Sequence, residues 1–123
     1  MLRVLLVEDN RTFRETFKHS LREHFPSLII EEATTGEEAL QMVNETPLRL
    51  IFMDIHLPGV NGLKLTQRIK KDFPDITIAA LTGYDLPEYR QAAFQSGADR
   101  FFVKESLPWG EIGALVKSLT QSD

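Results

Sequence analysis

The chain has 123 residues, of which 42% are hydrophobic and 26% are charged, a composition and length typical of one globular domain. A net charge of −4 offers no basic surface for nucleic acid, and the absence of cysteine excludes a disulfide framework or a thiolate metal site. No stretch approaches the ~20 apolar residues that a membrane span needs. We therefore expect a cytoplasmic domain that binds neither nucleic acid nor a membrane itself.

Five short apolar runs of β-strand length recur along the chain. They cover residues 4–7, 28–30, 48–53, 76–81 and 100–103. The third run, which includes Leu50 and Met53, shows no alternation of polar and apolar residues. Such a run is typical of a strand that is buried on both faces, as in a parallel sheet.

Helical patterns separate these runs. In the first, apolar residues recur at every fourth position, at Phe13, Phe17, Leu21 and Phe25. Pro26 then ends the helix. Four more helices are indicated by apolar spacing and by capping signals. One starts with Thr35 and Glu38 as a capping box, and the next runs from Leu65 to Phe73 before Pro74. The third starts with Asp85 and Glu88 as a second capping box, with Pro87 in its first turn and Gly97 after its end, and the last is the segment from Ile112 to Leu119.

Five strands alternating with five helices predict an α/β fold with helices on both faces of a parallel sheet. Right-handed crossovers and an apolar third strand favour a flavodoxin-like, doubly wound sheet of five strands in the order 2-1-3-4-5. We expect residues 1–123 to form this single domain.

Polar residues follow four of the five strands. They are the acidic pair Glu8 and Asp9, then Asp54, Thr82 and Lys104. Each has an ordinary explanation alone, as a helix cap, a turn residue or a solvated lysine, but the topology brings all of them to one edge of the sheet. Three carboxylates suit Mg²⁺, and an aspartate beside that ion can act as a nucleophile toward phosphorus. Lysine and threonine would share the charge of the transferred group, so the edge predicts phosphoryl transfer to Asp54.

These residues also carry a resemblance. From Val4 through Leu119 the chain resembles the receiver domain of a two-component response regulator, and the matching motifs are Glu8-Asp9, the block M-D-I-H-L-P-G-V-N-G that contains Asp54, Thr82-Gly83, Ser96-Gly97-Ala98-Asp99 and Lys104. The ending Lys104-Glu-Ser-Leu-Pro is similar to that of receivers that precede a helix-turn-helix DNA-binding domain. We therefore expect a piece of a longer transcription regulator rather than a complete single-domain regulator, with any output domain outside this chain.

The resemblance implies a site and a partner. Asp54 would accept phosphate from a sensor histidine kinase, with Mg²⁺ held by Asp9, by Asp54 and by the backbone carbonyl of His56. Glu8 would act through a metal-bound water. The domain would assist its own phosphorylation and dephosphorylation as a regulatory switch, not as an enzyme with turnover. The side chains of His56 and Tyr84 would flank the site and tune the lifetime of the phosphoryl group.

The resemblance also implies how the switch works. Lys104 would bridge to the phosphate, Thr82 would move toward it, and Phe101 would move inward with Thr82. The face formed by residues 86–119 would read this change, and a homodimer through that face is expected. Glu105 follows Lys104 where many receivers have proline, which leaves the isomer of that peptide bond open.

Three other functions compete with this interpretation. An aspartate-nucleophile phosphatase needs a second carboxylate two residues after the nucleophile, where this chain has His56. A receiver-like interaction module that no longer takes phosphate would lack one of Asp9, Asp54, Thr82 or Lys104, and all four are present. A nucleotide-binding function fails because the chain has no glycine-rich phosphate loop.

Overall fold

A computed structural model describes residues 2–59 and 61–121. Five strands are present: β1 (Arg3–Val7), β2 (Ile29–Ala33), β3 (Leu50–Asp54), β4 (Thr77–Thr82) and β5 (Arg100–Val103). The helices are α1 (Arg11–His24), α2 (Gly36–Glu45), α3 (Gly62–Asp72), α4 (Pro87–Gln95) and α5 (Trp109–Gln121), with a short 3₁₀ helix η1 (Lys104–Ser106) before α5.

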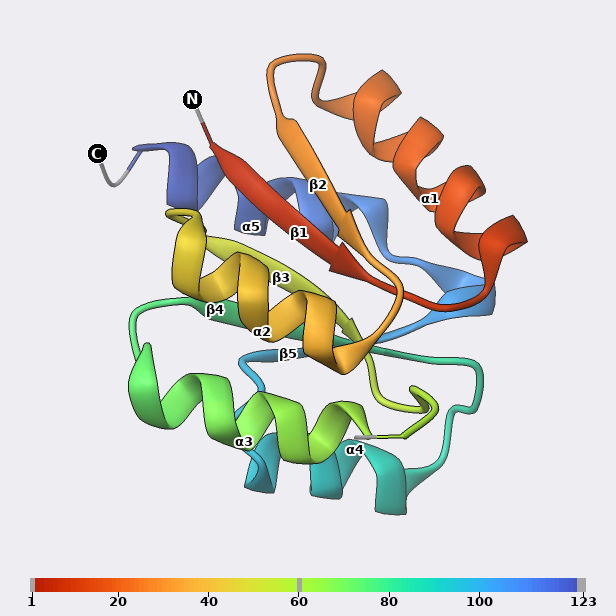
Figure 1. The fold of residues 1–123 in the computed structure, drawn as a ribbon. Coiled ribbons are helices and arrows are strands. Elements are labelled where there is room, and N and C mark those ends of the chain that lie inside the picture. Colours follow the sequence, from red (N-terminus) through yellow and green to blue (C-terminus); the bar gives the residue numbers. More distant parts are fainter. Residues whose placement is uncertain (1, 60, 122–123) are drawn as a thin grey trace.

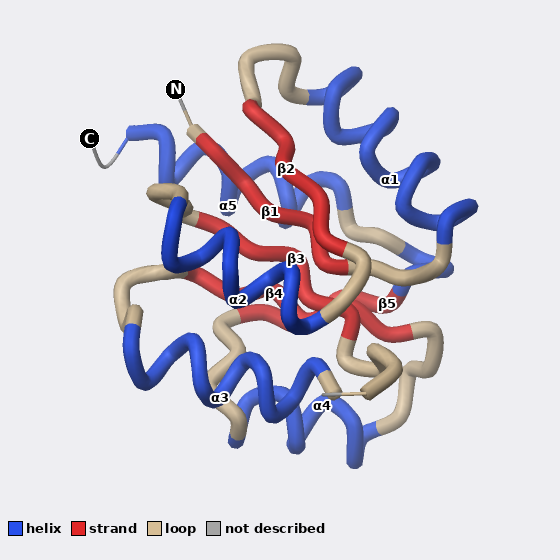
Figure 2. The backbone as a smooth tube through the Cα atoms, in the orientation of Figure 1, coloured by secondary structure: helices blue, strands red, loops and turns tan. Residues whose placement is uncertain are grey.

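All five strands are parallel and lie in the order β2-β1-β3-β4-β5. Figure 1 shows the sheet between two layers of helices, with α1 and α5 on one face and α2, α3 and α4 on the other. The same layers are seen in Figure 2, where the strands form the centre of the molecule. The predicted fold class and strand order are therefore confirmed.

Alternate residues of β3 divide the core into two layers. Leu50 and Phe52 pack in a cluster with residues of α1 and α5, whereas Ile51 and Met53 pack in a cluster with residues of α2 and α3. All four side chains are fully buried. Because successive side chains of a strand point to opposite faces, a central strand covered by helices on both sides must be apolar throughout.

Helix α4 packs more loosely than the other helices of its face. Ala93 is its one buried residue, in a small cluster with Ile55, Ala80, Ala98 and Phe101. The sequence predicted a capping box at its start, and that prediction is wrong: the N-cap is Leu86, which makes no side-chain capping hydrogen bond. Pro87 does occupy the first turn. Its fixed φ suits that position without a capping side chain.

The end of α4 follows the prediction. Ser96 is the C-cap and Gly97 follows with a φ of +103°, a conformation that glycine adopts without steric cost. The N–H of Gly97 donates to the carbonyl of Phe94, and the N–H of Ala98 donates to that of Ala93. These two bonds form a Schellman motif, after which Asp99 leads directly into β5.

Strand β2 is longer than the sequence indicates, because it extends through Glu31 and Glu32 to Ala33. Both glutamates are half-buried on this edge strand and pair with basic residues of neighbouring elements. Glu31 pairs with Arg3, and Glu32 pairs with Arg14 and Lys18. An edge strand tolerates such charges because one side of it faces solvent.

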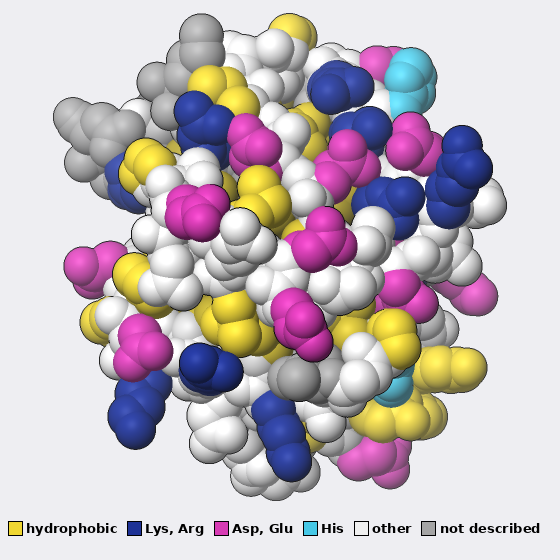
Figure 3. Space-filling model, in the orientation of Figure 1, with side chains coloured by type: hydrophobic (Ala, Val, Ile, Leu, Met, Phe, Trp, Pro, Cys, Tyr) yellow, Lys and Arg dark blue, Asp and Glu magenta, His cyan; other side chains and the backbone are white. Residues whose placement is uncertain are grey.

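The visible surface mixes both signs of charge. In Figure 3, Lys and Arg side chains lie among Asp and Glu side chains, and that face carries no extended basic patch. No helix in the described ranges has the length and apolar character to cross a lipid bilayer.

Candidate functional site

The register of the sheet aligns the polar residues at one edge. Val7 lies opposite Met53, so the residues that follow β1 are level with Asp54, the last residue of β3. Thr82 ends β4 opposite Val103, and Lys104 follows directly. The carboxyl ends of four neighbouring strands thus bring the predicted residues to one place, as expected for an open α/β sheet.

Three carboxylates gather at this edge. One oxygen from each of Glu8, Asp9 and Asp54 lies within 4.8 Å of the other two. Glu8 and Asp54 are buried, with exposed fractions of 0% and 3%, whereas Asp9 is exposed. The set consists of oxygen ligands, which Mg²⁺ prefers. Oxygens this close together can converge on one ion.

Lys104 neutralises part of this acidic cluster. Its Nζ lies 2.6 Å from Glu8 Oε1 and 3.6 Å from Asp54 Oδ2. The ammonium also lies 4.7 Å from the centre of the Phe13 ring, a cation–π contact that holds the side chain over the start of α1. The peptide bond between Lys104 and Glu105 is trans, as are all bonds between described residues.

Burial raises the pKa of Glu8 to about 7, and the negative charge of Asp54 adds to this rise. The pairing with Lys104 and the N–H of Asn10, which donates to Glu8 Oε2 at 3.0 Å, oppose it. Asn10 is also the N-cap of α1, because its Oδ1 accepts from the N–H of Phe13 at 2.9 Å. The cap of α1 therefore also holds Glu8 in place.

Asp54 lies in an open pocket of about 410 Å³ at the edge of the sheet. The lining residues are Glu8, Asp9, Asn10, Asp54, His56, Gly83, Tyr84, Lys104 and Glu105. The N–H of His56 donates to Asp54 Oδ1 at 3.0 Å, which leaves Oδ2 facing Lys104 at 3.6 Å. The backbone thus orients the carboxylate, which lies in an open pocket.

Gly62 sets how closely α3 approaches this strand end. A Cβ at Gly62 would collide with the carbonyl oxygen of Asp54 and would lie 2.7 Å from Ile55 Cα. Asn61 caps α3 by accepting from the N–H of Lys64 at 2.9 Å. A glycine is therefore required where the helix begins against the backbone of Asp54, while Val60 of the same loop lies outside the described residues.

Thr82 and Phe101, the two predicted switch residues, lie outside the pocket lining. Thr82 is fully buried beside it. Its hydroxyl faces His56 Nε2 at 3.3 Å and accepts from the N–H of Tyr84 at 3.1 Å. Phe101 is 7% exposed and packs with Ala93 and its neighbours, so its ring already faces inward here.

Sequence reasoning missed the contacts that orient the site. It placed His56 and Tyr84 beside Asp54 but did not predict that the imidazole reaches Thr82, because ring orientation leaves no pattern in the sequence. The sequence also gives no sign that the exposed His24 packs against α5. Its ring stacks on Trp109, with centroids 4.3 Å apart, and its Nδ1 lies 2.8 Å from the carbonyl oxygen of Ser20.

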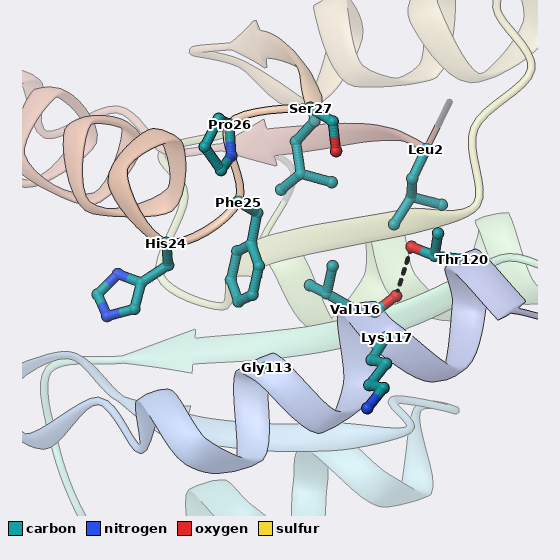
Figure 4. A pocket seen from close by; sticks show the side chains of 10 residues that line it. Leu2, His24, Phe25, Pro26, Ser27, Gly113, Val116, Lys117 and Thr120 are labelled. Atoms are coloured by element: carbon teal, nitrogen blue, oxygen red, sulfur yellow. Dashed lines mark hydrogen bonds between the residues drawn. The ribbon is translucent and has the colours of Figure 1, made fainter.

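A second cavity, of about 470 Å³, lies between the C-terminal end of α1 and helix α5 (Figure 4). Leu2, Phe25, Pro26 and Val116 supply much of its apolar lining, and the Thr120 hydroxyl donates to the Val116 carbonyl at 2.8 Å. Leu2 precedes β1, so this cavity lies at the opposite end of the strands from Asp54. The described residues that line it include no Asp or Glu, and the acidic edge remains the candidate site.

Comparisons with known proteins agree with this geometry. Residues 4–116 match the response regulator receiver domain family. The chain is 34% identical over 105 residues to the transcriptional activator protein ExaE of Pseudomonas putida, which covers 85% of this chain and 49% of that protein. It is 29% identical over 104 residues to the response regulator GacA of Pseudomonas viridiflava, with 85% and 49% covered. The chain thus spans about half the length of these curated relatives.

Solved structures give the same result. The response regulator protein TrrA of Thermotoga maritima, in complex with Mg²⁺ and BeF, is 35% identical with a TM-score of 0.83, covering 97% of this chain and 99% of that one. A signal receiver domain from Colwellia psychrerythraea has a TM-score of 0.89 at 22% identity, covering 98% and 99%, and supports the fold alone. Fold, acidic edge and family match agree, and this chain belongs to the response regulator receiver domain family.

Proposed function

We propose that this receiver domain is a phosphoacceptor switch, in which Asp54 takes a phosphoryl group from the phosphohistidine of a sensor histidine kinase. One observation carries the proposal: the Asp54 carboxylate lies in an open pocket beside two further carboxylates and the ammonium of Lys104. Crowded carboxylates with one ammonium suit phosphoryl transfer, which depends mainly on positioning and charge.

In the transfer one bond forms and one bond breaks. An oxygen of Asp54 attacks phosphorus while the bond from phosphorus to the histidine nitrogen breaks, and the electron pair stays on the imidazole. Lys104, 3.6 Å from Asp54 Oδ2, would balance the negative charge of the arriving group. Because the chain supplies both nucleophile and ammonium, assistance to its own phosphorylation and dephosphorylation belongs to the same proposal.

Mg²⁺ is the cofactor in this proposal. Asp9, Asp54 and the backbone carbonyl of His56 would hold the ion, and Glu8 would act through a bound water. The three carboxylate oxygens within 4.8 Å of one another support this assignment. Bound there, the ion would draw negative charge from the phosphoryl oxygens during transfer.

Phosphate at Asp54 would then shift an equilibrium between two arrangements of the same fold. Thr82 would turn toward the phosphate, Phe101 would be the aromatic partner of that step, and the face of residues 86–119 would carry the change to a partner. A homodimer through this face and an output in transcription complete the proposal. The names of the relatives support the output, and a cytoplasmic location stays a prediction.

Intact-mass spectrometry tests the acceptor. The protein is incubated with acetyl phosphate and Mg²⁺, and the expected result is one added phosphoryl group. The addition should disappear with EDTA and in Asp54→Ala, and it should persist in the matched variant Asp75→Ala, since Asp75 is exposed and does not line the pocket. A folded wild-type protein that gains no mass would support the interaction-module alternative instead.

Sedimentation velocity tests the dimer. We expect the sedimentation coefficient to rise when Mg²⁺ and beryllofluoride are added to the wild-type protein at micromolar concentration. Leu86 and Phe94 are 41% and 42% exposed on this face, so Phe94→Ser should suppress the rise without unfolding the domain. An unchanged profile in the wild type would refute dimerisation through residues 86–119.

A further inference from the structure

The Thr82 hydroxyl contacts two residues that line the pocket, His56 and Tyr84. Its Oγ1 accepts from the N–H of Tyr84 at 3.1 Å, lies 3.3 Å from the carbonyl oxygen of Tyr84, and lies 3.3 Å from His56 Nε2. With the imidazole proton on Nε2, the hydroxyl accepts from His56 and from the Tyr84 N–H and donates its own proton to the Tyr84 carbonyl, so its one proton and two lone pairs are all used. The side chain is fully buried and does not line the pocket that contains Asp54.

His56 is held in a definite orientation although it is exposed. Its N–H donates to Asp54 Oδ1, and its ring meets two tyrosines edge to face. The centroid of the Tyr84 ring is 5.6 Å away at 89°, and that of Tyr89 is 4.9 Å away at 80°. Edge-to-face rings at these distances attract one another and fix the direction of the imidazole. Its Nε2 therefore points at Thr82.

We propose that His56 is a positioning residue that keeps the Thr82 hydroxyl in its present contacts until a phosphoryl group at Asp54 competes for it. The proposal rests on the function proposed above. A hydroxyl whose capacity is used by His56 and Tyr84 cannot also bond a phosphate oxygen at Asp54 without losing one of these partners. The contact with His56 thus lowers the affinity of the site for a phosphoryl group and keeps the resting domain switched off.

The position of Phe101 supports this assignment. Its ring is already buried, with 7% exposed, while Thr82 still faces His56 and Tyr84. Space for the Phe101 ring is therefore not what holds Thr82 in its present position. The contacts of the hydroxyl itself do restrain it, and the contact to His56 is made by a side chain, which can be substituted.

A double-mutant cycle with Mg²⁺ and beryllofluoride as the probe tests the proposal. The dissociation constant of beryllofluoride is measured by ¹⁹F NMR in the wild type, His56→Phe, Thr82→Val and the double variant. Phenylalanine keeps the ring but removes the nitrogen that faces Thr82. His56→Phe should bind about two- to tenfold more tightly, the worth of one neutral hydrogen bond, and this gain should vanish in the Thr82→Val background.

Two further variants separate positioning from packing. His56→Gln keeps a hydrogen-bonding group on the side chain and should bind beryllofluoride like the wild type. His19→Phe changes an exposed histidine on α1, away from the site, and should have no effect. An equal effect of His56→Phe with and without the Thr82 hydroxyl, or none at all, would overturn the proposal while phosphorylation at Asp54 stands. A wild type that binds no beryllofluoride and takes no phosphate would overturn the proposed function as well.

Discussion

Lys104 pairs more closely with Glu8 than with the phosphoacceptor candidate of the same edge. Its Nζ lies 2.6 Å from Glu8 Oε1 and 3.6 Å from Asp54 Oδ2. The shorter ion pair is the buried one, since Glu8 is 0% exposed. The ammonium is thus engaged by Glu8 in the resting domain, and its share in binding phosphate depends on the protonation of that carboxylate.

The pH dependence of stability should therefore follow Glu8. Burial raises its pKa from 4.5 to about 7 in the folded state, so between these values the folded protein holds a proton that the unfolded chain has lost. The free energy of unfolding should fall as pH rises through this range, by on the order of 2–3 kcal/mol. Urea denaturation in EDTA from pH 4.5 to 8 measures it. Glu8→Gln should flatten the dependence, and identical slopes for both proteins would contradict this assignment.

Asp54→Ala should leave the fold intact or slightly more stable in the absence of metal. Asp54 raises the pKa of Glu8 by repulsion, so its removal relieves crowding among three carboxylates. Urea denaturation at pH 8 in EDTA should give a free energy of unfolding within about 1 kcal/mol of the wild type, or above it. A loss of several kcal/mol would show that the hydrogen bond from the His56 N–H outweighs the repulsion.

Lys104→Met should slow phosphorylation by acetyl phosphate by about 100-fold, the effect of removing one preorganised charge from a transfer site. The rate of mass gain at saturating Mg²⁺ measures this. The variant should also lose stability above pH 7, because the pairing with Lys104 helps Glu8 to ionise. Lys70→Met is the matched control, and an equal rate loss there would refute a specific role for Lys104.

Lys70 itself should affect stability but not the phosphorylation rate. Its Nζ lies 2.8 Å from Asp99 Oδ2 and donates to the carbonyl of Ile76 at 2.8 Å, which ties the end of α3 to the start of β5. Asp99 Oδ2 in turn accepts from the N–H of Ile78 at 2.9 Å. Lys70→Met should cost roughly 1–2 kcal/mol in urea denaturation. A change below 0.3 kcal/mol or so would show that solvent screens the pair fully.

Gly62→Ala should disturb the site through the backbone. The new methyl group would collide with the carbonyl oxygen of Asp54, so α3 must shift, at a cost of roughly 1–3 kcal/mol. The midpoint temperature of thermal denaturation and the rate of phosphorylation should both decrease. Gly110→Ala is the matched control on α5, where a Cβ meets nothing within 4 Å and alanine should stabilise the helix. Equal effects in both variants would contradict the steric argument.

The sequence predicts most of this fold because its signals are local and agree. The unbroken apolar run of β3, the proline that ends α1 and the glycine after α4 each determine their own element. The acidic edge is predictable for the same reason, since strand order alone brings Glu8, Asp54 and Lys104 together. What the sequence does not predict depends on tertiary context.

The charged part of β2 is one such feature. Glu31 and Glu32 do not resemble strand residues until the basic residues of β1 and α1 are placed beside them. The start of α4 is another, because Asp85 could accept a capping hydrogen bond only if the N-cap were one residue earlier than Leu86. The contact between His56 and Thr82 joins residues that are 26 positions apart, and only the loop geometry aims one at the other.

The single buried residue of α4 affects how the sequence of this domain can diverge in evolution. Since Ala93 and the partly buried Tyr89 are the α4 residues that pack in the core, the outward positions of α4 contribute little to folding free energy. New partner specificities can arise there by substitution, while the acidic edge, where Glu8, Asp54 and Thr82 are buried, keeps its chemistry. The fold thus separates the part that must be inherited unchanged from the part that is free to diverge.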